Sequence, residues 1–291
     1  MLNTNTPITE IIQQRFSCRE YQTELINADK RRQLQAFIAG LSPGPFGSTP
    51  RFDLLAATEE DRKSLRGLGT YGFIKNPPAF IIGAMAPAEY GLEDYGYLME
   101  SIILYATSLM LGTCWLGGTF TKSRFARKIN LATDESMPAI TSLGEFATPR
   151  QLRHGMISQV AGSHRRLSWE TMFFEEKLGT PIYPEKAGDY ATVLDMVRLA
   201  PSASNKQPWR ILKHDMFWRF YLQRTPGYGK GFLNKLLDIN DLQRVDMGIA
   251  MCHFELTANA LGLNGHWVVE EDMDESTEKM PEYLVSWRCQ P

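Results

Sequence analysis

Hydrophobic positions recur at helical spacing in two long segments of the chain, residues 94–115 and 246–267. In each segment the apolar residues lie three or four positions apart and are followed by a glycine-containing stop and a tryptophan, which predicts two long helices. Placed without a gap, the two segments are identical at eight of 22 positions. The matching pairs are Asp94/Asp246, Gly96/Gly248, Met99/Met251, Leu104/Leu256, Ala106/Ala258, Leu109/Leu261, Leu111/Leu263 and Trp115/Trp267.

A second correspondence lies in the same order along the chain. Leu41, Pro43 and Pro50 align with Leu199, Pro201 and Pro208. Two matches in one order predict an internal duplication, with a first half over residues 1–168 and a second half over residues 169–291. Two copies are too few for a solenoid, so we expect a fused pseudo-dimer.

The remaining pattern mixes helices and strands without strict alternation. Shorter helices are predicted over residues 8–15, 29–41 and 189–199, and strands over residues 51–57, 79–85, 139–146, 209–214 and 265–270. Residues 217–223 fit either a strand or a short helix. This order favours an α+β fold over a doubly wound sheet. The two long helices are expected to pack together and bury one continuous core.

Composition narrows the class of protein. The chain has 291 residues, 43% of them hydrophobic, and a net charge of −2 from 31 basic and 33 acidic residues. This balance gives no indication of nucleic-acid binding. Four scattered cysteines without C-x-x-C spacing favour reduced thiols, and the five histidines lack metal-ligand spacing. Residues 1–14 lack a hydrophobic signal core and residues 102–111 are too short for a membrane span, so we expect a cytoplasmic protein without a membrane partner.

The segment Ala200–Arg210, APSASNKQPWR, has the composition of a polar ligand-binding loop. Two prolines bracket small polar residues, so the backbone leaves the preceding helix there. The loop then offers hydroxyls, side-chain amides and backbone N–H groups to an extended polar ligand. From composition alone, an ordinary turn between a helix and a strand is the alternative.

Two further segments carry candidate chemistry. Arg15 and Arg19 flank Ser17, and two guanidinium groups at this spacing make a compact anion site; a solvated basic face is the alternative. Cys18 lies between these cations, which would lower the pKa of its thiol, unless the residue is a small buried filler. Residues 117–118, a glycine pair, would let the backbone approach a flat ligand closely, or form a plain turn.

These segments together resemble the nitroreductase-like flavoproteins. Ala200–Trp209 is similar to the family pattern A-P-S-x-x-N-x-Q-P-W, Arg15–Arg19 to R-x-S-x-R, and His164–Glu170 to K-x-R-x-P-L-E. The resemblance covers most of the chain and is closest to the branch in which two halves are fused. It implies a nitroreductase-like fold, a pseudo-dimer around central helices, FMN as cofactor and NAD(P)H as electron donor.

The resemblance also implies roles for individual residues. Arg15 would bind the FMN phosphate, Ser17 the phosphate or ribityl chain, and Arg19 the N1–O2 edge of the flavin, where a cation stabilises the reduced ring. Arg19 is therefore the candidate catalytic residue. A backbone N–H at Gly117 or Gly118 would point at flavin N5. The other cofactor-binding residues that it implies are Arg166, Pro201, Ser202, Ser204 and Asn205.

The matches are divided between the halves. The first half has the arginines, but Gly47 stands opposite Asn205 of the signature loop. Carrying the alignment back places Phe173, Glu175 and Lys177 opposite Arg15, Ser17 and Arg19. We therefore expect one composite site and one FMN per chain, and the fused architecture is compatible with a monomer.

The function implied by the resemblance is that of an FMN-dependent NAD(P)H oxidoreductase. Its acceptors would be nitroaromatic, quinone or similar conjugated compounds, reduced by hydride transfer through flavin N5. Two alternatives stay open: a flavin-binding or sensing protein with little turnover, and a specialised flavin reaction such as reductive dehalogenation or flavin fragmentation.

Overall fold

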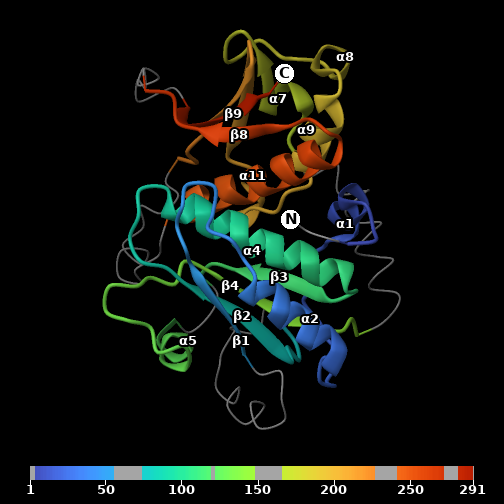
Figure 1. Ribbon diagram of the computed structural model, residues 1–291, viewed down its shortest axis with the longest axis vertical. Helices are drawn as coiled ribbons and strands as arrows, with labels where there is room; N and C mark the ends of the chain where they lie inside the picture. The colour runs from blue at the N-terminus through green and yellow to red at the C-terminus, as the bar shows by residue number, and fades with distance from the viewer. Residues whose placement is uncertain are drawn as a thin grey trace.

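Two β-sheets lie at opposite ends of the molecule with two long helices between them (Figure 1). The computed structural model describes residues 4–55, 74–118, 122–147, 166–226, 241–271 and 281–290. The long helices are α4 (Gly91–Ser108) and α11 (Leu242–Ala260). The smaller helices are α1 (Ile8–Gln14), α2 (Ala28–Ala39), α5 (Lys122–Lys128), α7 (Trp169–Met172), α8 (Pro184–Ala187) and α9 (Tyr190–Arg198). Of these, α1, α2 and α9 pack against the long helices. The predicted α+β class is confirmed.

The first sheet is antiparallel throughout. Its strands lie in the order β1 (Arg51–Leu55), β2 (Ala79–Ala84), β4 (Ile140–Gly144) and β3 (Gly112–Leu116). Strand β2 is buried along its whole length because both faces of the sheet are covered. Ile81 faces the core that contains α4, while Ile82 faces a second core where Phe125 of α5 packs. A run of apolar residues without alternation is what such a doubly covered strand requires.

The second sheet has one more strand. Its order is β5 (Phe173–Glu175), β6 (Trp209–His214), β7 (Phe217–Leu222), β9 (Glu282–Cys289) and β8 (Gly265–Val268). Strand β5 runs parallel to β6, and every other neighbouring pair is antiparallel. Residues 217–223, left open by the sequence, therefore contribute a strand.

Strand β5 overturns one part of the predicted alignment. Ser17 pairs with Thr113 of β3, at one edge of the first sheet. Phe173 pairs with Ile211 of β6, at the edge of the second sheet away from β8. Strand β8 follows the second long helix as β3 follows the first, so β3 and β8 are equivalent strands of the two sheets. The segment beginning at Arg15 lies at the β3 edge of its sheet, whereas the segment beginning at Phe173 lies at the edge opposite to β8. The alignment of Phe173, Glu175 and Lys177 with the arginine segment is therefore wrong.

Two aligned glycines let the long helices touch through their backbones. A Cβ on Gly96 would lie 2.1 Å from the carbonyl oxygen of Val245, and one on Gly248 would lie 1.9 Å from that of Glu93. The ungapped alignment pairs Glu93 with Val245 just as it pairs Gly96 with Gly248. The two contacts are thus equivalent under a pseudo-two-fold relation, which places the duplication at the centre of the fold.

One hydrophobic core joins the two sheets through these helices. Ile81 of the first sheet, Ile103 of α4, Met251 of α11, and Ile211 and Phe220 of the second sheet all belong to it. The expectation that the two long helices pack together and bury one continuous core is confirmed. Burial of this much apolar surface is the main stabilising contribution to the packing of the two sheets.

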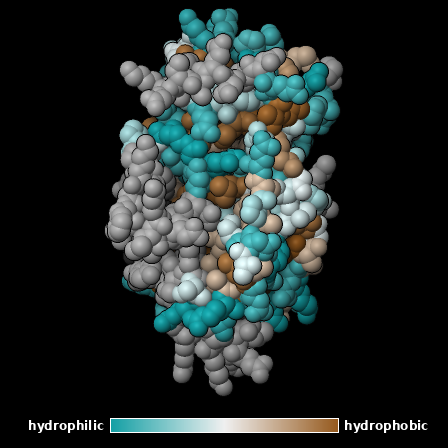
Figure 2. All heavy atoms as spheres, turned by 90° about the vertical axis from the view of Figure 1, so that its left-hand side faces the viewer, coloured by the Kyte–Doolittle hydropathy of each residue, from teal (hydrophilic) through white to brown (hydrophobic). Residues whose placement is uncertain are grey.

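The outer surface contains both hydrophobic and hydrophilic side chains. In the face drawn in Figure 2, hydrophobic atoms form separate groups between hydrophilic ones. Among the residues that the structure describes, no helix has the length and apolar character needed to cross a membrane. In the same residues, no cluster of three His, Cys, Asp or Glu side chains could hold a metal ion.

Candidate functional site

The arginine segment, Arg15–Arg19, runs alongside strand β3 and in the same direction. Ser17 forms a parallel bridge with Thr113, and the Cys18 N–H donates to the Thr113 carbonyl oxygen at 2.8 Å. The approach is close because Gly112 has no side chain: a Cβ there would lie 2.8 Å from Cys18 Cβ. Side chains alternate along this extended segment, so Cys18 points into the protein while Ser17 and Arg19 are exposed.

Cys18 is a packing residue, so of the two alternatives for this position the small buried filler is confirmed and the lowered pKa is not. Its side chain belongs to the core on the outer face of the first sheet. Burial raises the pKa of the Cys18 thiol to about 11. Desolvation of the thiolate thus outweighs the hydrogen bonds with Glu20 and Tyr21, which lower the pKa of the thiol.

Arg15, at the end of α1, is a buried cation without a hydrogen-bonded partner for its Nε. The residue is 4% exposed, and within the described part of the chain Nε has no hydrogen bond. A carboxylate oxygen, Glu100 Oε1, lies 3.8 Å from this nitrogen, beyond hydrogen-bond length. Burial lowers the pKa of Arg15, although Glu100 acts in the opposite direction. A buried guanidinium whose Nε has no hydrogen bond fits the binding of an anion such as a phosphate.

Arg166 brings a second cation to the same place. Its Nη1 donates to the Ala200 carbonyl oxygen at 2.6 Å and its Nη2 to the Leu199 carbonyl oxygen at 2.9 Å. These are the carbonyls that follow α9, so Arg166 caps that helix. Burial, with repulsion from Arg15 and Arg198, lowers the pKa of Arg166 to about 10. Arg166 therefore joins the start of the signature loop to the surroundings of Arg15.

The glycine pair ends strand β3 beside the beginning of α11. A Cβ on Gly117 would lie 2.5 Å from Leu242 Cδ1, while Gly118 is exposed. Gly117 thus leaves room for the Leu242 side chain where the strand of one half meets the long helix of the other.

The signature loop, Ala200–Trp209, is fastened to α11 by a carboxylate. The Ala203 N–H donates to both carboxylate oxygens of Asp246, at 2.9 and 3.1 Å. Ser204 and Asn205 are exposed and have φ angles of 51° and 54°, in the left-handed region. Left-handed residues other than glycine cost about 1 kcal/mol each, so the loop holds a shape that the chain alone would not favour.

Gln207 and Trp209 hold the shape of the loop from the protein side. The Gln207 N–H donates to Ser202 Oγ at 2.9 Å, and its side-chain oxygen accepts from the Leu167 N–H at 2.9 Å. The Gln207 side-chain amide also donates to the Asn205 carbonyl oxygen at 3.1 Å. Trp209 is fully buried in the main core.

Asp246 is an important residue that sequence reasoning did not single out for this role. Its aligned counterpart Asp94 accepts hydrogen bonds from the N–H groups of Phe46 and Ser48, at 2.9 and 2.8 Å. Each long helix therefore anchors one loop through the same aspartate. The shared Asp of the two repeats was the available signal.

A buried polar network next to Arg15 was also missed. His253 Nε2 lies 3.0 Å from Glu100 Oε1, and His253 Nδ1 lies 2.9 Å from the Met196 carbonyl oxygen. Trp115 Nε1 donates to Glu100 Oε2 at 2.7 Å. His253 is fully buried.

The structure thus gathers most of the predicted residues at the junction of the halves. The arginine segment and the glycine pair lie along β3, Arg166 lies near Arg15, and the signature loop rests on α11. His164 and Arg165 of the basic segment lie outside the described residues.

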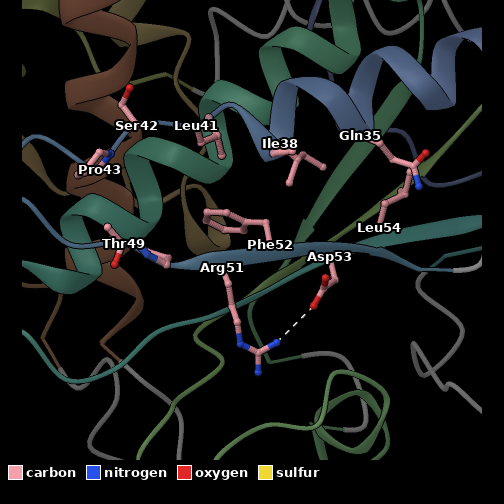
Figure 3. Close-up of a pocket in the computed structure, with 12 residues that line it drawn as sticks. Gln35, Ile38, Leu41, Ser42, Pro43, Thr49, Arg51, Phe52, Asp53 and Leu54 are labelled. Carbon is pink, nitrogen blue, oxygen red and sulfur yellow. Dashed lines mark hydrogen bonds and ion pairs between the residues drawn. The ribbon is translucent and has the colours of Figure 1, made fainter.

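A pocket of about 430 Å³ lies elsewhere, between α2 and β1 (Figure 3). Its lining includes Leu41 and Ser42, which align with Leu199 and Ala200 of the second half, and none of the predicted site residues. The carbonyls of Leu199 and Ala200 accept hydrogen bonds from Arg166.

Comparisons with known proteins agree with this architecture. A sequence model of a family described as "Putative TM nitroreductase" matches residues 7–258. A solved structure described as a putative nitroreductase from Thermotoga maritima superposes with a TM-score of 0.61 at 18% identity, covering 99% of this chain and 96% of that one. At this identity the likeness shows a shared fold.

Shorter nitroreductases match only part of the chain. A structure in complex with FMN from Desulfovibrio desulfuricans is 22% identical, with a TM-score of 0.39, and covers 50% of this chain and 89% of its own. One with bound FMN from Desulfitobacterium hafniense is 21% identical, with a TM-score of 0.39, and covers 49% and 91%. No curated protein matches the chain.

Proposed function

We propose, from the premise that the chain belongs to the family described as "Putative TM nitroreductase", that it is an FMN-dependent NAD(P)H oxidoreductase. The observation that carries the proposal is the buried guanidinium of Arg15, whose Nε lacks a hydrogen bond within the described residues while Arg166 lies near. A buried cation with an unfilled hydrogen-bond donor is costly in a protein interior. A phosphate would accept a hydrogen bond from Arg15 and offset the positive charge of both arginines.

The order of residues along β3 supports the same ligand. Arg15 begins the row, Ser17 and Arg19 follow on the exposed side, and Gly117 ends the strand beside them. A ligand with a phosphate at one end, a hydroxylated chain and a flat ring at the other would meet these groups in that order. FMN has this construction, and when bound it would supply the hydride chemistry.

The residues of the chain would then bind the FMN phosphate, orient the ribityl chain and stabilise negative charge on the flavin ring. Arg15 would hold the phosphate, and Ser17 the phosphate or ribityl chain. Arg19 would place a positive charge beside the ring, stabilising negative charge there. Ser204 and Asn205 would cover the ligand from the second half, in a conformation maintained through Asp246. Strained residues of this kind concentrate at functional sites.

Both halves contribute to this site. We propose that residues 1–168 and 169–291 are the two halves and that a single chain completes one FMN site, without a partner subunit. Nitroaromatic or quinone compounds are the proposed acceptors, with NAD(P)H as the electron donor. No side-chain acid or base is assigned.

The first test is the flavin content of the purified protein. FMN is added, unbound flavin is removed by desalting, and acid-released flavin is counted per chain. About one FMN per chain is expected. Two per chain would contradict the single composite site, and none would contradict the proposal. NAD(P)H oxidation with a nitroaromatic or quinone acceptor then follows; retained flavin without turnover would favour a flavin-binding protein.

Two arginine variants separate binding from tuning. Arg15→Ala is expected to weaken FMN binding by about tenfold or more, because a charged hydrogen bond is lost. Arg19→Ala is expected to slow flavin reduction by NAD(P)H more than it weakens FMN binding. Arg32→Ala, an exposed residue of α2, is the matched control for total charge. Unchanged affinity in Arg15→Ala, or unchanged reduction in Arg19→Ala, would remove the assigned role.

A further inference from the structure

Glu100 and His253 meet where α4 and α11 cross, in the protein interior. Both side chains are fully buried, and Nε2 of the histidine lies 3.0 Å from Oε1 of the carboxylate. The other ring nitrogen, Nδ1, lies 2.9 Å from the Met196 carbonyl oxygen. A buried carboxylate at this position would ordinarily be an ideal partner for the nearby Arg15.

The proton count of this group fixes its charge. A carbonyl oxygen only accepts, so Nδ1 must carry a hydrogen to bond Met196. The Nε2···Oε1 contact then needs a second hydrogen, on the ring or on the carboxyl group. In the first case imidazolium faces carboxylate, and in the second a neutral ring faces a carboxylic acid. Glu100 and His253 together are neutral in both.

Glu100 is consequently engaged by His253, and within the described residues Arg15 Nε has no hydrogen-bonded carboxylate. The second oxygen of Glu100 accepts from Trp115 Nε1 at 2.7 Å, so both oxygens are engaged. Arg15 Nε stays 3.8 Å from Oε1. Arg166, and beyond it Arg198, add further positive charge to these surroundings.

We propose that His253 is a positioning residue for phosphate binding: it occupies and neutralises Glu100, and thereby keeps Arg15 available to the phosphate of the ligand. The inference rests on the proposed FMN site. Without a donor at the Nε2 position, the carboxylate would draw Arg15 into a direct ion pair and compete with the phosphate.

The pseudo-two-fold relation supplies an internal control. Under the ungapped alignment, Glu100 corresponds to Cys252 and Ser101 to His253. The pseudo-symmetry-related counterpart of the Glu100–His253 contact is therefore the contact between Ser101 Oγ and Cys252 Sγ, at 3.3 Å. It lies in the same helix crossing and carries no charged pair, so Cys252→Ser probes packing at this crossing without altering Glu100.

Two replacements of His253 distinguish its two contacts. His253→Gln keeps an N–H donor near the position of Nε2, and His253→Asn keeps one near the position of Nδ1 only. Apoprotein is titrated with FMN and with riboflavin, which lacks the phosphate, and the ratio of the two Kd values is the readout. His253→Asn is expected to weaken FMN binding about tenfold, the size of one charged hydrogen bond. Riboflavin binding is expected to stay within about twofold.

The other variants fix the interpretation. Cys252→Ser should retain the preference for FMN, and Glu100→Gln should restore it in His253→Asn. His253→Gln, which donates to Glu100 without neutralising it, should retain part of the preference and lie between His253→Asn and the wild type. Equal weakening of both flavins, or an unchanged ratio in His253→Asn, would overturn the role of His253 while leaving the FMN site intact. If His253→Asn does not fold, Glu100→Gln alone decides: a retained preference supports the inference and a lost one contradicts it. A wild-type protein that binds neither flavin would overturn the proposed function itself.

Discussion

The backbone contact between the long helices gives a quantitative prediction for Gly248→Ala. In an ordinary helix this substitution is favourable by about 1 kcal/mol, because alanine has the higher helix propensity. Here the added Cβ would lie 1.9 Å from the Glu93 carbonyl oxygen and 2.9 Å from the Tyr97 nitrogen. Both neighbours are backbone atoms of α4, so no side chain can turn away.

The size of the effect follows from the required movement. An unstrained contact needs about 3.4 Å, so α4 and α11 must separate by roughly 1.5 Å at this point. A gap of 0.5–1 Å already removes about a quarter to a half of a dispersion contact, and the flanking side chains all lose contacts when rigid helices part. Overpacking costs typically about 1–3 kcal/mol. With the upper value and the propensity gain, we expect a net loss of about 2 kcal/mol or more.

Urea denaturation, followed by circular dichroism and tryptophan fluorescence, measures this loss as a change in the free energy of unfolding. Gly91→Ala is the matched control, because its Cβ would meet the flexible end of Met85 instead of backbone. Gly96→Ala should resemble Gly248→Ala, since the two contacts are equivalent. A stability for Gly248→Ala equal to that of Gly91→Ala would refute the helix contact.

Two further predictions concern titratable groups. Burial raises the pKa of Asp246 well above its ordinary value, although the hydrogen bond from Ala203 acts in the opposite direction. The folded state therefore binds the Asp246 proton more tightly than the unfolded chain does. The contribution of Asp246 to the free energy of unfolding consequently falls as pH rises above about 4. Asp246→Asn should flatten that part of the curve of unfolding free energy against pH, and an unchanged slope would contradict the assignment. Burial also raises the pKa of the Cys18 thiol to about 11, so alkylation by iodoacetamide at pH 8 should be slow in the folded protein and fast in urea; equal rates would show an accessible thiolate.

The sequence was most informative where a local pattern decides the structure. Strand β6 has the predicted bounds, because a run of aromatic and branched residues follows Pro208 directly. The long helix α11 begins earlier than predicted, at Leu242, because Asp241 caps it by accepting from the Gln243 and Arg244 N–H groups. Strands β3 and β9 were not predicted: β3 is short and begins with a glycine, so it reads as the turn after a helix.

The residues of the site that belong to sequence motifs could be predicted, whereas the contacts between residues far apart in the chain could not. The arginine segment and the signature loop were identified from residue order, and their roles toward FMN stay predictions. The contact between Glu100 and His253 joins residues far apart in the chain and depends on where two helices cross. No local pattern encodes such a crossing, so His253 looked like an ordinary helix residue until the second helix was placed beside it.

Fusion of the two halves into one polypeptide changes what mutation can do to this crossing. In a dimer of identical chains, any codon change would appear on both sides of the symmetry axis, so an acidic residue facing a histidine would have to occur twice. Here one side holds Glu100 with His253 and the other holds Cys252 with Ser101. A gene that encodes both copies in tandem can acquire a mutation in one half without changing the other half. Selection can therefore keep the residues on one side of the axis while those on the other side drift. Only one ionisable pair must then be accommodated between the helices.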